Sequence, residues 1–182
     1  MKILKIILLV ILALVSALIL LYAYYGGFNK VKFQISEQGG ETVIYKEMIG
    51  DYNNSGFVMD TIHKMLLTDH KLDLKTGFGI YYDNPQQIEK NKLRADVGYF
   101  INDVDSAKLA ELQGKYMIKT LPRGKYLYTE IPFKGRLSIF IGIMKVYPAI
   151  AKYFKEQNVD ECGAITEIYD TQNKKIIYRK AL

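Results

Sequence analysis

Tyrosine is the residue type in this sequence that offers most to binding chemistry, since the chain carries fifteen tyrosines and no tryptophan. Phenol rings that share one face of a sheet form an amphipathic pocket wall, suited to an apolar or cationic small molecule. Ordinary sheet packing is the alternative explanation, because tyrosine has a high preference for strands. The tyrosines that fall at alternating positions of predicted strands are Tyr81, Tyr82, Tyr126, Tyr128 and Tyr169.

Glu167 is the strongest candidate for a binding carboxylate. It lies at the middle of a predicted strand, 164–170, and is flanked by Ile165 and Ile168. A carboxylate among aromatic side chains suits a delocalised cation, through charge pairing and attraction to the ring faces. The alternative is a solvent-facing strand glutamate that lies opposite a lysine.

Other kinds of site have little support in the sequence. His63 and His70 are the only histidines, and two helical turns separate them by about 10 Å, too far for one metal ion. We interpret both as solvated helix residues. Cys162 is the single cysteine, which excludes an internal disulfide and a cysteine-based zinc cluster. No catalytic triad or glycine-rich phosphate loop has usable spacing, so we expect no metal and no cofactor.

A hydrophobic segment precedes everything that could form a site. Residues 6–25 contain no charge, and a helix of that length spans roughly 30 Å of hydrocarbon. A cleaved signal is the alternative, but its core is usually about 7–15 residues long and ends at small residues, whereas this segment ends in bulky tyrosines. We therefore predict a single-pass membrane protein, with the lipid bilayer contacting 6–25, an anchor and hinge at 1–27 and one domain at 28–182.

The charge pattern leaves the side of the membrane open. Lys2 and Lys5 favour a cytoplasmic N-terminus, but Lys30 and Lys32 nearly cancel that asymmetry. The net charge of +6 is spread along the chain without a basic block. It therefore indicates a solvated surface and attraction to anionic headgroups, and we expect no nucleic acid partner.

Periodicity predicts the elements that must position the candidate residues. Alternation predicts strands at 31–35 and 93–101. Residue types and turn signals predict further strands at 42–49, 78–83, 164–170 and 174–181, and two segments around Arg123-Gly124 are predicted to pair with each other. Helical spacing predicts a helix of three to four turns after residue 53, a short one at 105–113, and a core helix with a start or kink near Pro148.

The order strand-helix-strand-strand occurs twice, in residues 42–102 and 119–182. This internal repeat predicts an α+β domain, with one antiparallel sheet and both helices on one face. The other face would then be concave, and we expect the pocket there. Tyr82 and Tyr169 hold equivalent places in the two halves, so they are predicted to flank a central pocket.

Two strings of residues carry a resemblance to a known family. "IYYDNP…LRADVGYFI" and "LSIFIGIMKVYPAIAKYFKEQNV…TEIYD" resemble the GyrI-like small-molecule-binding family, which includes the effector domains of the multidrug regulators Rob and BmrR. The resemblance covers about residues 42–182. It implies that Glu167 faces a central aromatic pocket and meets cationic ligands. No helix-turn-helix precedes the domain, so the regulators' transcriptional role is not implied.

Within that family, an N-terminal anchor followed directly by this domain is similar to an animal single-pass receptor of ER-phagy. That likeness implies a cytosolic domain, whereas the charges around residues 6–25 weakly favour a domain on the other side of the membrane. The chain stops at Leu182, without the receptor's long acidic tail, so we expect no role in ER-phagy. Ligand binding or sensing at a membrane is the leading prediction. A protein-interaction scaffold and a hydrolase of reactive small molecules are the alternatives, and we expect that the chain is not an enzyme.

Overall fold

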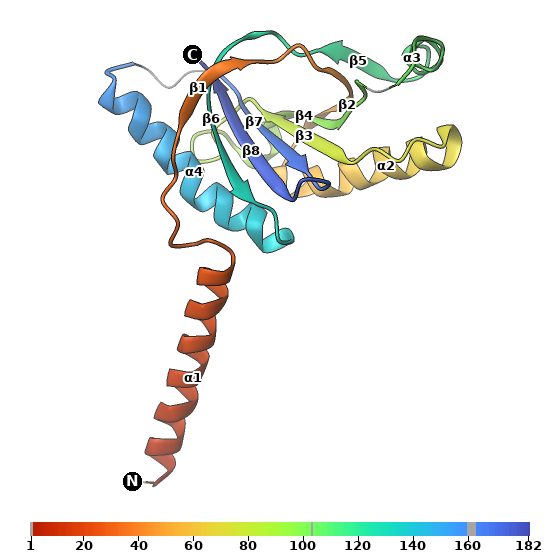
Figure 1. Cartoon of the computed structure of the whole chain (residues 1–182). Coiled ribbons are helices and arrows are strands. Elements are labelled where there is room, and N and C mark those ends of the chain that lie inside the picture. The colour runs from red at the N-terminus through yellow and green to blue at the C-terminus, as the bar shows by residue number, and fades with distance from the viewer. Residues whose placement is uncertain (1, 103, 160–162) are drawn as a thin grey trace.

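The computed structural model describes residues 2–102, 104–159 and 163–182, and Cys162 lies outside these ranges. The first helix, α1 (Lys2–Tyr24), extends away from the rest of the chain, and none of its residues is buried (Figure 1). The remaining described residues form one sheet with three further α-helices, α2 (Ser55–His70), α3 (Ser106–Gln113) and α4 (Arg136–Glu156). By length and composition, α1 and α4 are each apolar enough to cross a membrane.

The sheet has eight strands in the order β1-β6-β8-β7-β3-β4-β2-β5, and each neighbouring pair is antiparallel. The predicted α+β class with an antiparallel sheet is therefore confirmed. The second strand has the predicted bounds, whereas the first begins three residues later than predicted. The strands are β1 (Gln34–Gln38), β2 (Thr42–Ile49), β3 (Thr76–Tyr81), β4 (Arg94–Phe100), β5 (Met117–Thr120), β6 (Gly124–Pro132), β7 (Ile165–Asp170) and β8 (Lys175–Ala181).

The predicted hairpin around Arg123-Gly124 is wrong. β5 pairs with β2, whereas β6 pairs with β1 and β8. Between β5 and β6 the chain crosses the segment that connects β1 to β2. At this crossing the Gly40 amide donates to the Leu121 carbonyl, and the Leu121 amide donates to the Glu41 carbonyl, each at 2.8 Å. Gly39 has a φ of +92°, and a Cβ there would lie 1.9 Å from the Pro122 carbonyl oxygen. The turn signal therefore marks a crossing, at which the chain continues to the other end of the sheet.

α2 and α4 cover the same face of the sheet, as predicted. One row of cross-strand partners defines this face: Lys46, Val97, Gly79, Glu167, Tyr178 and Thr129. Val97 belongs to the cluster that packs against α2, and Tyr178 packs against α4. α4 runs unbroken through Pro148 from Arg136, so the predicted start near Pro148 is wrong.

The opposite face is filled at its centre by side chains, which corrects the prediction of a concave pocket there. Phe78 and Ile168, on neighbouring strands, form a buried cluster with Val43, Ile80 and Leu121. Leu121 lies where the β5–β6 connection crosses the β1–β2 connection. The crossing therefore places the Leu121 side chain against this face of the sheet.

Candidate functional site

Glu167 lies at the centre of the helix-covered face. Its cross-strand neighbours are Gly79 on β3 and Tyr178 on β8, and only 1% of its surface is exposed. The side chain points toward α4, from which Tyr147 reaches it. Glu167 therefore lies on the helix-covered face of the sheet and not on the opposite face, where we expected the pocket.

Both carboxylate oxygens of Glu167 accept a hydrogen bond from a tyrosine. The Tyr147 hydroxyl donates to Oε1 and the Tyr169 hydroxyl donates to Oε2, each at 2.7 Å. The Tyr81 hydroxyl lies 3.3 Å from that of Tyr169, so it extends the chain of hydroxyls. Hydrogen bonds of this length to a carboxylate are strong, and together they fix its orientation.

Burial sets the charge behaviour of this group. It raises the pKa of Glu167 to about 7, although the hydrogen bonds from Tyr147 and Tyr169 act in the opposite direction. Burial also raises the pKa of both tyrosines well above its ordinary value, and the nearby carboxylate adds to this rise. The tyrosines therefore remain neutral donors, while Glu167 changes its charge near neutral pH. A cation placed beside it would favour the ionised form.

Two glycines of β3 make room above the sheet next to Glu167. A Cβ on Gly79 would lie 2.7 Å from the Tyr81 hydroxyl, so the Tyr81 side chain folds over this glycine. A Cβ on Gly77 would lie 2.4 Å from the terminal methyl of Met59 on α2. Side chains at these two positions would displace Tyr81 and Met59.

A cleft of about 230 Å³ opens beside this glycine strand, between α2 and the ends of β3 and β7. Met59, His63 and Tyr99 form part of its wall, together with Gly77 and Tyr169. Tyr169 therefore lines the cleft and donates to Glu167, which connects the open space to the buried carboxylate. Among the described residues, no cluster of histidine, cysteine, aspartate and glutamate could hold a metal ion.

Of the predicted tyrosines, Tyr169 joins Glu167, whereas Tyr82, Tyr126 and Tyr128 do not. Tyr82 is 41% exposed and donates to Asp96 on the opposite face of the sheet. The hydroxyls of Tyr126 and Tyr128 donate to the Pro122 carbonyl and to Gln34, respectively. The neighbour of Tyr169 is thus Tyr81, the residue before Tyr82.

Tyr147 is the member of the site that the sequence reasoning missed as a ligand-binding residue. It belongs to the apolar stripe that predicted α4. Its position near the middle of that stripe is the signal that could have identified it. A phenol on the buried side of a helix requires a hydrogen-bond partner on the sheet.

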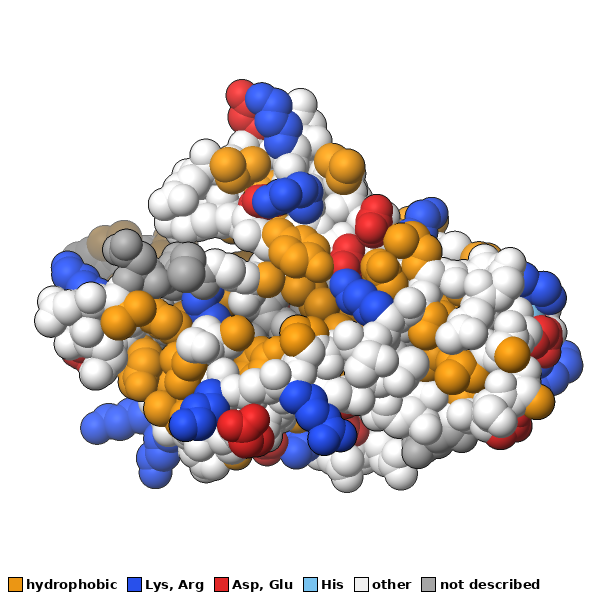
Figure 2. Space-filling model, turned by 90° about the horizontal axis from the view of Figure 1, so that it is seen from above, with side chains coloured by type: hydrophobic (Ala, Val, Ile, Leu, Met, Phe, Trp, Pro, Cys, Tyr) orange, Lys and Arg blue, Asp and Glu red, His pale blue; other side chains and the backbone are white. Residues whose placement is uncertain are grey.

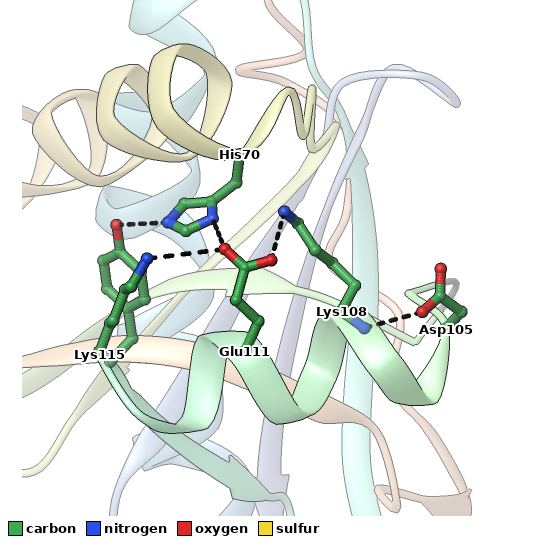
Figure 3. Close-up of polar contacts among 6 residues, drawn as sticks. His70, Asp105, Lys108, Glu111 and Lys115 are labelled. Atoms are coloured by element: carbon green, nitrogen blue, oxygen red, sulfur yellow. Dashed lines mark hydrogen bonds and ion pairs between the residues drawn. The ribbon is translucent and has the colours of Figure 1, made fainter.

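His70 is buried, so its interpretation as a solvated residue is wrong. Figure 3 shows that it points from the end of α2 toward Glu111 on α3. Its Nδ1 lies 2.9 Å from Glu111, and its Nε2 lies 3.2 Å from the Tyr116 hydroxyl. Lys108 and Lys115 also contact Glu111. This cluster joins α2 to α3 and lies apart from the cleft, so we assign it a structural role.

This architecture, an antiparallel sheet with a buried glutamate beneath one of two covering helices, is that of a small-molecule-binding domain. The sequence pattern of the GyrI-like small molecule binding domain matches residues 32–177. The chain therefore belongs to this family, and the resemblance drawn from the sequence motifs is confirmed.

Individual relatives agree with the family. The chain is 27% identical over 125 residues to human testis-expressed protein 264, a match that covers 65% of this chain and only 38% of that protein. The crystal structure of the EcmrR C-terminal domain has a TM-score of 0.55 to this chain at 10% identity, and the match covers 84% of this chain and 99% of that domain. The structure of SAV2435 bound to tetraphenylphosphonium has a TM-score of 0.50 at 16% identity, and the match covers 81% of this chain and 91% of the SAV2435 chain. At these identities the two structures establish a shared fold.

Proposed function

We propose that residues 1–27 anchor the domain, residues 28–182, at a membrane, where it binds a small apolar cation in the cleft beside Tyr169. Glu167 would supply the countercharge, and Tyr81, Tyr147 and Tyr169 would supply the ring faces. Tetraphenylphosphonium, the compound bound to the structurally similar SAV2435, has the chemistry that this arrangement suits. Its positive charge is spread over an apolar surface and needs no hydrogen-bond acceptor.

The observation that carries this proposal is the buried carboxyl of Glu167 with two tyrosine donors. Ionising a buried carboxylate is unfavourable unless a positive charge or hydrogen bonds compensate it. The two side-chain partners of Glu167 are the hydroxyls of Tyr147 and Tyr169, which are neutral and supply no positive charge. The donors hold the carboxylate in place, and a bound cation would provide the missing positive charge.

The cleft provides a path for the ligand, although it is smaller than a typical drug-binding pocket of roughly 300–1,000 Å³. Met59 is a flexible side chain in contact with Gly77, and methionine adapts readily to the shape of a ligand. Movement of Met59 and the partly exposed Tyr169 ring would extend the cleft toward Glu167. We therefore expect binding to enlarge the space between α2 and α4.

Binding of tetraphenylphosphonium to the full-length chain in detergent micelles, measured by equilibrium dialysis at about pH 8, tests the proposal. Because Glu167 is ionised there, we expect saturable binding that Glu167→Gln weakens by about tenfold or more. Asp96→Asn is the matched control. It removes one carboxylate from the opposite face, so it changes the net charge equally without touching the site.

Partition of the cation into micelles affects all three chains equally and cancels in the comparison. Equal binding by the wild type and Glu167→Gln would place any cation site elsewhere. Loss of binding in Asp96→Asn as large as that in Glu167→Gln would indicate a nonspecific charge effect. Either result contradicts the proposal, as does the absence of saturable binding by the wild type.

A further inference from the structure

α4 carries exposed apolar side chains on the side that faces away from the sheet. Leu137, Phe140 and Met144 are 44%, 62% and 57% exposed, respectively. Their spacing of three and four residues places them on one face of the helix. Ser138 and Val146, on the other side of the same turns, are buried. We call Leu137, Phe140 and Met144 the α4 strip.

The same helix region holds the end of α1. The Lys134 ammonium donates to the Tyr24 carbonyl at 2.7 Å and lies 4.3 Å from the centre of the Tyr24 ring. The Lys145 ammonium donates to the Gly26 carbonyl at 2.7 Å. Carbonyls in the last turn of a helix have no partner within that helix, so Lys134 caps the C-terminal end of α1, while Lys145 binds the loop that follows this helix.

These contacts fix the height of the α4 strip relative to a bilayer. α1 has 23 residues and a length of roughly 35 Å, slightly more than the ~30 Å hydrocarbon core. Its C-terminal Tyr24 therefore lies near the headgroups when α1 spans the membrane. Lys134 contacts Tyr24, so the beginning of α4 lies at the same level.

The position of α4 in the fold agrees with this placement. Figure 1 shows α4 on the side of the domain from which α1 extends. Figure 2 shows the face seen from above, away from α1, where charged side chains of both signs are spread among hydrophobic ones. Exposed basic residues flank the end of α1 and the start of α4, at Lys30, Lys32 and Arg136. They would attract anionic headgroups.

We propose that the α4 strip inserts into the boundary between headgroups and acyl chains, in the leaflet that holds the C-terminal end of α1. The partner of this exposed helix face is therefore the lipid bilayer. The inference rests on the proposed anchoring by α1 and adds a second membrane contact, which fixes the orientation of the domain. An interfacial helix of this kind buries its apolar face by about 5–10 Å.

Because the chain contains no tryptophan, a single introduced tryptophan reports its own surroundings. Phe140→Trp tests the strip, and Leu67→Trp is the matched control, at an exposed apolar position of α2. Leu14→Trp, in the middle of α1, tests the anchoring alone. Each full-length variant is placed in nanodiscs at one chain per disc, with lipids brominated near the acyl carbonyls or along the acyl chains, and tryptophan quenching is measured.

We expect the shallow bromines to quench Phe140→Trp strongly, the deep bromines to quench Leu14→Trp, and neither to quench Leu67→Trp. Quenching of Leu14→Trp without quenching of Phe140→Trp would overturn the proposed insertion of the strip and leave the anchoring intact. Absence of quenching in both would overturn the anchoring and the insertion together. Blue-shifted but unquenched emission from Phe140→Trp would overturn the proposal, because protein would then cover the strip.

Discussion

Glu167 should make the folded domain less stable as the pH rises through neutrality, and Glu167→Gln should remove this effect. Burial raises the pKa of Glu167 in the fold to about 7, from an ordinary value of 4.5. Between these two values the folded state binds more protons than the unfolded state. Stability from the protonated carboxyl is therefore fully present below the unfolded pKa and is lost as the pH rises through the folded pKa.

The size of the effect follows from the two pKa values. Each unit of difference corresponds to about 1.4 kcal/mol, so full ionisation reduces the free energy of unfolding by roughly 3 kcal/mol. Between about pH 5 and about pH 8, the expected loss is about 2.5 kcal/mol, because part of the change lies below that range. Glutamine carries no charge and retains an oxygen for the Tyr147 or Tyr169 hydroxyl, so it should not show this loss.

Urea unfolding of the full-length chain in detergent, followed by circular dichroism across this pH range, measures the effect. The informative quantity is the difference in unfolding free energy between the wild type and Glu167→Gln. The two proteins share every other titratable group, so the contributions of those groups cancel in this difference. A difference that stays constant from about pH 5 to about pH 8 would refute the raised pKa. A wild type that gains stability relative to the variant as the pH rises would refute even its direction.

Three further substitutions test single contacts. Tyr147→Phe removes a hydrogen bond that lowers the pKa of Glu167, so the midpoint of the pH series should move upward and binding of tetraphenylphosphonium at neutral pH should weaken. Gly98→Ala places a Cβ 2.0 Å from the backbone oxygen of Ile44 and should cost about 1–3 kcal/mol, measured by urea unfolding. Tyr178→Phe removes a buried hydroxyl without a hydrogen-bond partner in the described chain. It should leave the unfolding free energy unchanged or raise it by up to about 1 kcal/mol, and a decrease in the unfolding free energy would contradict this expectation.

Local patterns predicted the strands of this sheet well but not all of their pairings. The turn at Gly39-Gly40 and the break at residues 50–56 predicted the bounds of β2, because clusters of glycine, asparagine and serine interrupt strands. The pairing of β5 with β2 depends on the crossing at Leu121, which brings together residues far apart in the sequence. Arg123-Gly124 has the composition of a turn, and composition does not distinguish a reversal from a crossing.

The site shows the same limit at the level of single residues. Adjacent tyrosines such as Tyr81 and Tyr82 must point to opposite faces, but alternation does not say which face the helices cover. Tyr81 therefore lies beside Tyr169, and Tyr82 lies beside Asp96. Tyr147 was hidden because it belongs to a helix, and its contact with Glu167 depends on how α4 packs against the sheet.

α4 connects the two proposals physically. Its Tyr147 holds the Glu167 carboxylate, its Lys145 holds the end of the anchor, and Phe140 lies on its exposed side. If the bilayer fixes this helix, ligand binding that widens the space between α2 and α4 must displace α2, because α4 cannot move without leaving the lipid. The flexible wall of the cleft should then be Met59 on α2. An apolar cation, which concentrates at a membrane surface, would meet a site whose rigid half is held at that surface.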